Sequence, residues 1–333
     1  MKKLLALTFS KYISVFFYFL LAASLITFSA NNESQTQLEH THPKTNNGSI
    51  PSIYLKPFSE DSPWNKKINS DYLFTNKVPA IKIIPFNIPV KLEINSNQWS
   101  IPFYISTKSD PINKIYIEEN NQHSYINLPE NALPAKGSDG HLCIFNTELN
   151  IIYEFYKFSK SSNKNEARAK LLRIIDPNGM GISDHPGMNI GTRAYGGSAV
   201  AGLLRKHELY GYDKINHALA VALSRKYLRP NYVWPASSED SFSKNEYKGN
   251  IKMGTLVTIN QHLDIDKELR NKLAIKIAYS LRIYGGYIVD SAGRNNLTLY
   301  SEPGVNNNYL DEAKTDLNKI LDNLIFIEGN PKD

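Results

Sequence analysis

Short runs of alternating apolar and polar residues characterise the chain between Val78 and Ile126. Proline, asparagine, serine and aspartate separate the runs, as turn residues separate the strands of a sheet. The runs are Ile81–Ile84, Val90–Ile94, Ile101–Ile105 and Lys114–Glu118. This pattern predicts a series of short β-strands.

The clearest strand pair is a hairpin of His141–Asn146 with Ile151–Lys157. Residues Thr147–Asn150 form the connection between the two strands. If Glu148 and Leu149 are the central turn residues, the turn sets the register of the whole pair.

This register decides which side chains of the hairpin share a face. It places Cys143 opposite Glu154. It also places His141 opposite Tyr156. Because side chains alternate along a strand, one face is purely apolar and is predicted to be core. The apolar face consists of Leu142, Ile144, Tyr153 and Phe155, and the polar face consists of His141, Cys143, Phe145, Ile152, Glu154 and Tyr156.

Helical patterns appear after Gly197, in the second half of the chain. Ser198 and Asp213 are suitable N-caps for the first two helices. The predicted helices cover residues 198–210, 213–223, 266–284 and 310–324, and further strands are predicted at 287–290 and 297–300. The sequence therefore predicts a mainly β fold with helices inserted late in the chain.

The N-terminus has the three-part form of an export signal, with Met1-Lys-Lys before an apolar run at residues 12–30. The run is about 19 residues long, so it can also span a bilayer as an uncleaved anchor. In either case the preceding positive charge places the remainder outside the cytoplasm, secreted or periplasmic. Residues 31–50 are predicted to be a disordered spacer. Residues 51–333 are predicted to form a single domain, although their length also allows two small ones.

Composition narrows the classes of partner. The net charge is +6, and 20 of the 333 residues are tyrosine. The modest positive charge favours an acidic polysaccharide or cell-surface glycan, while no Lys/Arg cluster is dense enough to predict nucleic-acid binding. Membrane contact is expected only through residues 12–30, if they are retained. The single cysteine, Cys143, is predicted to be a buried thiol.

Two groups on the polar face of the hairpin are candidates for acid–base chemistry. His141 can act as acid, base or metal ligand if Asp139 or Glu154 orients its ring, or it can complete a hydrogen-bond network in the sheet. Glu154 lies between Tyr153 and Phe155, where a carboxylate needs a partner or a raised pKa. It can then serve as a general acid, the alternative being a strand residue that points to water.

The remaining candidates lie later in the chain. His217 is expected in the first turn of the second helix, where the positive helix end keeps the ring neutral, as a base or a buried hydrogen-bonding group. Asp290 ends an apolar strand and faces either a cleft or its own turn amides. Residues expected to grip a substrate are Tyr156, Arg193, Tyr195 and Tyr284. The sequence has no metal-ligand spacing, nucleophile elbow or phosphate loop, so neither a metal nor a cofactor is predicted.

Several sequence blocks occur together in a fixed order. They are Pro57–Asn65, Asp139–His141, Tyr153–Phe155, Gly202–Leu209, His217–Leu219, Met253–Leu256 and Tyr284–Asp290. In this order the chain resembles a broad set of exported bacterial and fungal proteins, from Pro57 to Glu302. The resemblance implies a jelly-roll-like β-sandwich with late helical insertions. By association alone, the resemblance also implies an activity on polysaccharides.

These features favour an exported carbohydrate-active protein. In a lyase, Tyr or His removes the C5 proton of a uronic acid while Arg, His or Asn neutralises its carboxylate. The positive net charge of the chain and the His141/Tyr156 pair slightly favour this mechanism. In a glycoside hydrolase two carboxylates act, and the available acids are Asp139, Glu154 and Asp290. The alternative to an enzyme is a non-catalytic surface protein that binds glycan or a host protein.

Overall fold

Strands make up most of the regular structure, and the chain is mainly β as the sequence predicts. A computed structural model describes residues 50–68, 80–81, 91–211, 213–293 and 295–328. The predictions for residues 1–49 lie outside these residues. Residues 45–333 form one unit, and its described part holds no helix long and apolar enough to cross a membrane.

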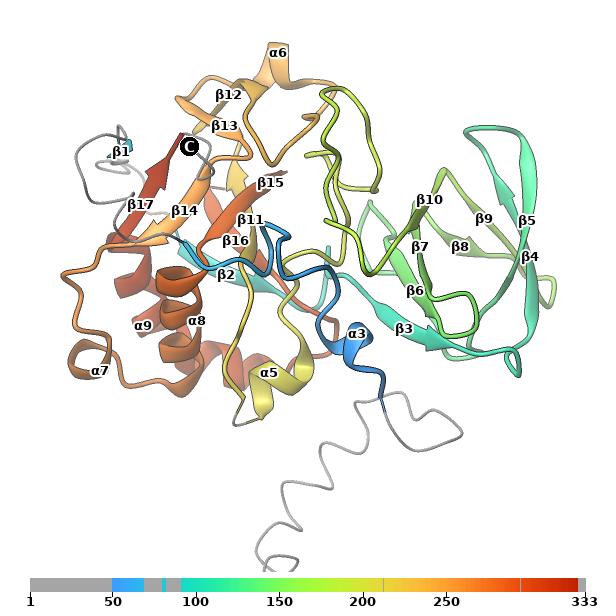
Figure 1. Ribbon diagram of the computed structural model, residues 1–333, viewed down its shortest axis with the longest axis horizontal. Coiled ribbons are helices and arrows are strands. Elements are labelled where there is room, and N and C mark those ends of the chain that lie inside the picture. Colours follow the sequence, from blue (N-terminus) through green and yellow to red (C-terminus); the bar gives the residue numbers. More distant parts are fainter. Residues whose placement is uncertain (1–49, 69–79, 82–90, 212, 294, 329–333) are drawn as a thin grey trace, which may run out of the picture. The chain divides into compact units, whose positions relative to one another are not determined.

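Among the described residues, the largest sheet has seven strands (Figure 1). In order across the sheet they are β1 (Ala80–Ile81), β17 (Leu324–Ile327), β14 (Leu256–Ile259), β15 (Gly286–Ala292), β11 (Leu219–Ser224), β16 (Asn296–Tyr300) and β2 (Lys91–Asn95). The pairs β11–β15 and β16–β2 are parallel, and the other neighbours are antiparallel. Helix α8 (Lys272–Ile283) packs against β14, helix α9 (Asn307–Asp322) packs against β2, and the two helices contact each other.

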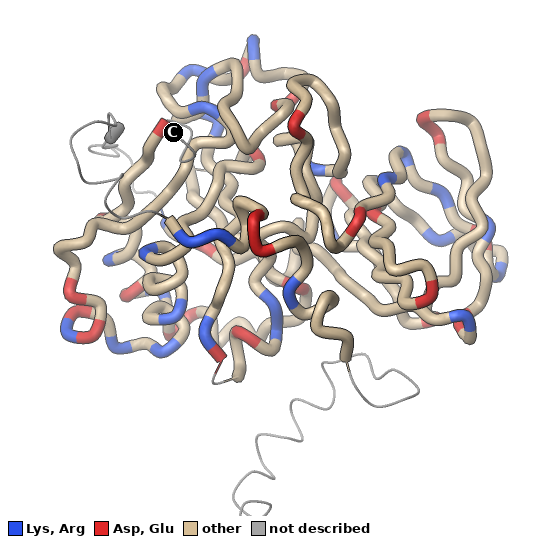
Figure 2. Tube along the Cα trace, viewed as in Figure 1, with Lys and Arg blue, Asp and Glu red and all other residues tan. Residues whose placement is uncertain are grey.

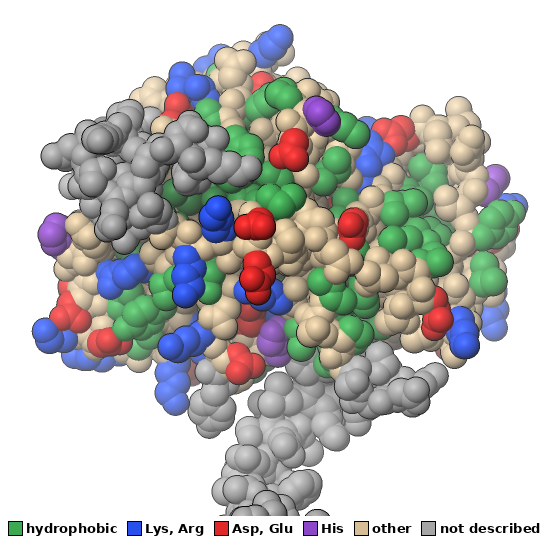
Figure 3. Space-filling view, viewed as in Figure 1, with side chains coloured by type: hydrophobic (Ala, Val, Ile, Leu, Met, Phe, Trp, Pro, Cys, Tyr) green, Lys and Arg blue, Asp and Glu red, His purple; other side chains and the backbone are tan. Residues whose placement is uncertain are grey.

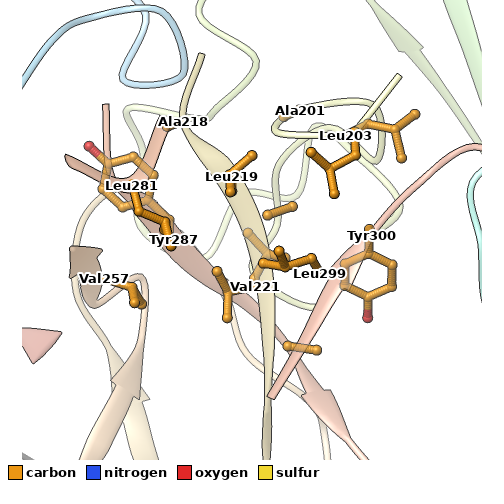
Figure 4. Close-up of a cluster of buried hydrophobic side chains, with 14 of the residues drawn as sticks. Ala201, Leu203, Ala218, Leu219, Val221, Val257, Leu281, Tyr287, Leu299 and Tyr300 are labelled. Carbon is orange, nitrogen blue, oxygen red and sulfur yellow. The ribbon is translucent and has the colours of Figure 1, made fainter. Parts of the chain in front are cut away.

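Strand β11 shows that the helix predicted over residues 213–223 was wrong. Every residue of β11 is buried, and the strand pairs on both edges, with β15 and with β16. Leu219 and Val221 lie among apolar side chains of these neighbours, including Tyr287 and Leu299 (Figure 4). A short apolar run fits a fully buried strand as well as a helix, and here pairing on two edges decides between them.

The helix predicted from Ser198 through Tyr210 was wrong over more than half of its length. Residues 198–204 form a buried loop, and only Lys206–Tyr210 are helical, as α5. Ser198 caps no helix, because its hydroxyl donates to Oε1 of Glu154 instead. A partner distant in sequence therefore outweighs the local capping signal.

The later helices agree with the prediction. Helices α8 and α9 match those predicted at 266–284 and 310–324, except that a short break separates α7 (Ile265–Glu268) from α8. The Asn271 side chain accepts hydrogen bonds from two backbone N–H groups in the first turn of α8, so this break begins a new capped helix. Strands β15 and β16 coincide with the two strands predicted between these helices.

Two four-stranded sheets enclose a second, smaller core. One sheet has the order β10 (Leu171–Ile175), β7 (Ile151–Tyr156), β6 (Leu142–Asn146) and β3 (Phe103–Ser106). The other has the order β5 (Gln122–Asn127), β4 (Ile112–Ile117), β9 (Glu166–Ala169) and β8 (Ser159–Lys160). The remaining described elements are β12 (Leu228–Tyr232), β13 (Ile251–Met253), α3 (Ser52–Leu55) and α6 (Ser243–Glu246).

The hairpin of β6 and β7 has the predicted register. Cys143 pairs with Glu154, and Leu142 pairs with Phe155. Both faces are buried, however, because Cys143 packs in the core of the large sheet while Leu142 and Phe155 pack in the smaller core. The hairpin therefore separates the two cores, which encloses Glu154 and confirms Cys143 as a buried thiol.

Charged residues are dispersed over the described chain. Lys and Arg lie scattered among Asp and Glu along the trace (Figure 2). On the face drawn in space-filling form, acidic, basic and apolar side chains are interspersed (Figure 3). Charges dispersed in this way do not mark a binding face.

Candidate active site

A cleft of about 1040 Å³ lies at the large sheet. Its walls come from β2, α9, β15 and β16 and from the loops around residues 138–141, 189–194 and 238–242. Five residues singled out from the sequence line it, namely Asp139, His141, Tyr156, Arg193 and Asp290. A large cleft that brings acidic, basic and aromatic groups together is the candidate active site.

Asp290 lies in β15 at the point where the strand is bulged. The partner of β11 shifts there from Ile288 to Asp290, which leaves Val289 as the extra residue. A bulge re-aims the side chain that follows it. The Asp290 side chain is 19% exposed, and its carboxylate accepts a hydrogen bond of 2.8 Å from the Ser291 N–H.

The pKa of Asp290 is raised to about 7. Burial is the largest cause, and the nearby carboxylates of Asp240 and Asp139 raise it further, while Arg193 and the Ser291 N–H act in the opposite direction. A carboxyl group with this pKa holds a proton for part of the time at neutral pH. It can therefore donate that proton to a reacting group in the cleft.

Asp240 is a cleft residue that the sequence analysis missed. Burial raises the pKa of its carboxyl group, and hydrogen bonds with Tyr247 and Ser291 lower it in part. The acidic pair Glu239-Asp240 in a polar loop is the only sequence signal at this position. Loops carry no periodicity that indicates where a side chain points, so this signal alone does not predict a site.

Asp139 reaches the cleft from the turn that precedes β6. Its backbone carbonyl accepts the Lys157 N–H at 2.7 Å, and its Oδ1 accepts the Ser138 hydroxyl at 3.0 Å. Gly140 follows in the left-handed region with a φ of 51°, and a Cβ there would lie 3.2 Å from the Phe158 carbonyl oxygen. The Asp-Gly pair thus makes a tight turn that fixes the carboxylate at the cleft.

His141 lies deeper in the same wall and is 4% exposed. Burial lowers its pKa to about 3, and the charge of Arg193 lowers it too, so the ring is neutral at physiological pH. Nδ1 lies 3.4 Å from Oγ1 of Thr192, and the ring centre lies 5.4 Å from that of Tyr156. A neutral ring that contacts Tyr156 can orient or accept a proton, but it cannot act as a cationic acid.

Burial raises the pKa of Tyr156, and the nearby carboxylates of Asp139, Asp290 and Asp240 raise it further. A negative surrounding disfavours the tyrosinate form, so the phenol stays protonated.

Arg193 provides the buried positive charge of the cleft. Its side chain is 1% exposed, and its guanidinium carbon lies 3.5 Å from the centre of the Tyr300 ring. Nη1 is 3.7 Å from Oδ2 of Asp290, which is an ion pair but too long for a hydrogen bond. Among the described residues, Nε and Nη1 have no hydrogen-bond partner. Both nitrogens are enclosed, so Arg193 acts on the cleft through its positive charge beside Asp290.

Glu154 does not line the cleft and is fully buried beneath it. Its Oε1 accepts hydrogen bonds from the Ser198 hydroxyl and from the Ala199 N–H, the latter at 2.8 Å. Its Oε2 accepts the Thr192 N–H at 3.3 Å, and the Thr192 hydroxyl is 3.4 Å from it. Glu154 therefore holds the loop that carries Thr192 and Arg193, and it reaches His141 only through Thr192.

His217 also lies outside the cleft. It precedes β11 instead of beginning a helix, so the basis for predicting a neutral ring was wrong. Burial alone would lower the pKa of His217, but the Glu208 carboxylate, 3.0 Å from Nε2, raises it above its usual value. Nδ1 lies 2.8 Å from the Ala218 carbonyl oxygen, so both ring nitrogens have partners within the fold.

The two other tyrosines are part of the packed interior. Tyr195 is fully buried, and its hydroxyl donates to the carbonyl groups of Ser198 and Gly181. Tyr284 is 7% exposed and ends α8, away from the residues that line the cleft. Neither side chain is placed to contact a ligand in the cleft.

Metal-binding geometry does not appear in the part of the chain that the structure describes. No group of three or more His, Cys, Asp or Glu side chains there is arranged to hold a metal ion. Comparison of the chain with protein-family models, curated proteins and solved structures found no match.

Proposed function

We propose that the protein is a glycoside hydrolase in which Asp290 is the general acid. The observation that carries the proposal is the raised pKa of Asp290, about 7, in a cleft with two further aspartates. Glycosidases use one carboxyl group that holds a proton and a second that is ionised. Different environments for neighbouring carboxyl groups are the physical means of separating these roles.

Asp139 is the proposed partner of Asp290. Its carboxylate is partly exposed at the cleft and accepts one hydroxyl from Ser138, which leaves acceptor capacity for a water or a sugar. Asp240 is instead bonded by Tyr247 and Ser291, and its charge raises the pKa of Asp290. In this scheme Asp290 protonates the leaving oxygen, Asp139 acts as base or nucleophile, and Asp240 keeps Asp290 protonated.

A lyase is the second candidate, on a specific observation. The neutral His141 ring contacts Tyr156, and the positive charge of Arg193 beside Asp290 can attract a substrate carboxylate. The electrostatics weigh against it, because the raised pKa of Tyr156 disfavours a tyrosinate base. A bound uronate would also place a negative charge beside Asp290, Asp240 and Asp139, and these carboxylates would repel it.

The proposed substrate is a polysaccharide or cell-surface glycan outside the cytoplasm. The export pattern of residues 1–30 and the resemblance to exported proteins support this location. The packing of two four-stranded sheets around one core supports a β-sandwich for residues 103–175, and the jelly-roll arrangement stays a prediction.

The test is a screen of the purified protein against neutral and acidic polysaccharides. Reducing ends and absorbance near 235 nm are read together, for wild type, Asp290→Asn and the exposed control Asp184→Asn. We expect reducing ends without new absorbance, at a rate reduced at least about a hundredfold by Asp290→Asn and unchanged by Asp184→Asn. New absorbance at 235 nm would establish the lyase instead. Binding without either signal would favour a non-catalytic glycan-binding protein.

A further inference from the structure

Among the described residues that line the cleft, Trp99 is the aromatic residue with an exposed side chain. The chain has three tryptophans, and Trp99 is 39% exposed while Trp64 is 1% exposed and Trp234 is partly buried. Trp99 lines the same cleft as Asp139. An indole that stays open to solvent beside candidate catalytic groups presents a flat apolar surface to whatever occupies the cleft.

The backbone of Trp99 is held in an unfavourable conformation. Its φ is 52°, in the left-handed region that bulky residues avoid. The Trp99 N–H donates to the Lys136 carbonyl at 2.7 Å, next to a parallel bridge between Gln98 and Lys136. Strain of this kind persists where the surrounding structure enforces it, and it concentrates at ligand-binding positions.

The indole ring is fixed on the wall that carries Asp139. Nε1 donates to the Ser138 hydroxyl at 3.2 Å, and that hydroxyl donates to Oδ1 of Asp139 at 3.0 Å. The ring edge packs on Gly137, since a Cβ at that residue would lie 2.9 Å from Nε1. One hydrogen-bonded chain therefore sets the ring and the carboxylate together, and any ligand that contacts Asp139 lies close to the indole.

We propose that Trp99 forms a sugar-binding subsite, in which a pyranose ring of the substrate stacks on the indole next to Asp139. The C–H groups of a pyranose face carry partial positive charge and meet the negative face of the indole ring, while hydroxyl groups at the sugar edge remain free for polar partners. This inference rests on the proposed function for the class of ligand, and it adds the subsite that positions the chain for cleavage.

Binding is measured with the protein carrying Asp290→Asn, which removes turnover. The probes are hexasaccharides of β-1,4-glucose, β-1,4-mannose, β-1,4-xylose and α-1,4-galacturonic acid, with tryptophan fluorescence and calorimetry as readouts. At least one probe should bind and shift the fluorescence. Adding Trp99→Ala should weaken its binding about tenfold or more, whereas Trp99→Phe, which keeps a stacking face, should weaken it about threefold or less.

Leu133→Ala is the matched control, because Leu133 is 59% exposed and does not line the cleft. It should leave the affinity unchanged, and circular dichroism should show that every variant is folded. The subsite is overturned if none of the hexasaccharides binds, or if Trp99→Ala leaves the affinity within twofold. Trp99-dependent binding without cleavage by the wild type would support the subsite and overturn the hydrolase. Cleavage with a KM that Trp99→Ala does not change would support the hydrolase and overturn the subsite.

Discussion

Asp290 is expected to destabilise the fold at high pH, and replacing it should therefore stabilise the protein there. Its carboxyl group has a pKa of about 7 in the folded chain, against an ordinary value of 3.8. The folded state thus holds a proton that the unfolded state has already released between these two pH values. Unfolding becomes easier as pH rises through this window, because deprotonation favours the unfolded chain.

The size of the destabilisation follows from the rise in the pKa of Asp290. A rise of roughly three pKa units, at about 1.4 kcal/mol per unit, corresponds to about 4 kcal/mol of folding free energy once the group is ionised in both states. The side chain is 19% exposed, and solvent screening reduces the effect, so we expect about 2–4 kcal/mol. Asp290→Asn imitates the protonated group and should avoid this loss.

The assay is urea unfolding of the wild type and of Asp290→Asn at pH 5, 7 and 8.5, at one salt concentration. The variant's advantage in free energy of unfolding should grow from pH 5, where roughly a third of the effect is already present, to pH 8.5, where it should reach about 2–4 kcal/mol. The exposed control Asp184→Asn should show a difference that does not grow with pH. An Asp290→Asn protein that is less stable than wild type at pH 8.5 would refute the buried, proton-holding carboxyl group, and with it the basis of the proposed acid.

Two further predictions concern carboxylates outside the cleft. Glu154→Ala leaves the Ala199 and Thr192 N–H groups and the Ser198 hydroxyl without their acceptor. Urea unfolding should therefore show that the free energy of unfolding falls by about 3–5 kcal/mol. A fall below about 1 kcal/mol, the level expected for the exposed control Glu148→Ala, would contradict this role of Glu154. Glu208→Gln should destabilise most between pH 4.5 and 6.5, where the Glu208 carboxylate with its lowered pKa is ionised and His217 with its raised pKa is protonated. The loss should shrink as pH rises through the raised pKa of His217, and a loss that grows above that pH would contradict the pair.

The hairpin was predictable because two independent local signals agree. The turn fixes the register, and strict alternation fixes the faces, so the pairing of Cys143 with Glu154 followed from the sequence. The enclosure of both faces did not follow, because it depends on a second core contributed by strands elsewhere in the chain. Local pattern determines which residues share a face, but not what covers that face.

The helix predicted at 213–223 failed for the same physical reason. Alanine and leucine in β11 satisfy helical and strand patterns alike, and only pairing with β15 and β16 selects the strand. The change moved His217 from an expected helix terminus to a buried pair with Glu208. An error in secondary structure thus became an error in the expected charge state of a side chain.

Glu154 and Asp290 were both candidates because a carboxylate in an apolar segment needs either partners or a raised pKa. Burial raises the pKa of both carboxyl groups, and the structure distinguishes them by the donors around each one. Glu154 is enclosed by hydroxyl and N–H donors of residues 192–200, whereas Asp290 accepts one N–H and faces Arg193 at 3.7 Å. Oxygen atoms that are already bonded serve the fold, and oxygen atoms left with capacity at a cleft can serve a ligand. Because those donors come from segments distant in sequence, composition and spacing do not distinguish a structural carboxylate from a catalytic one.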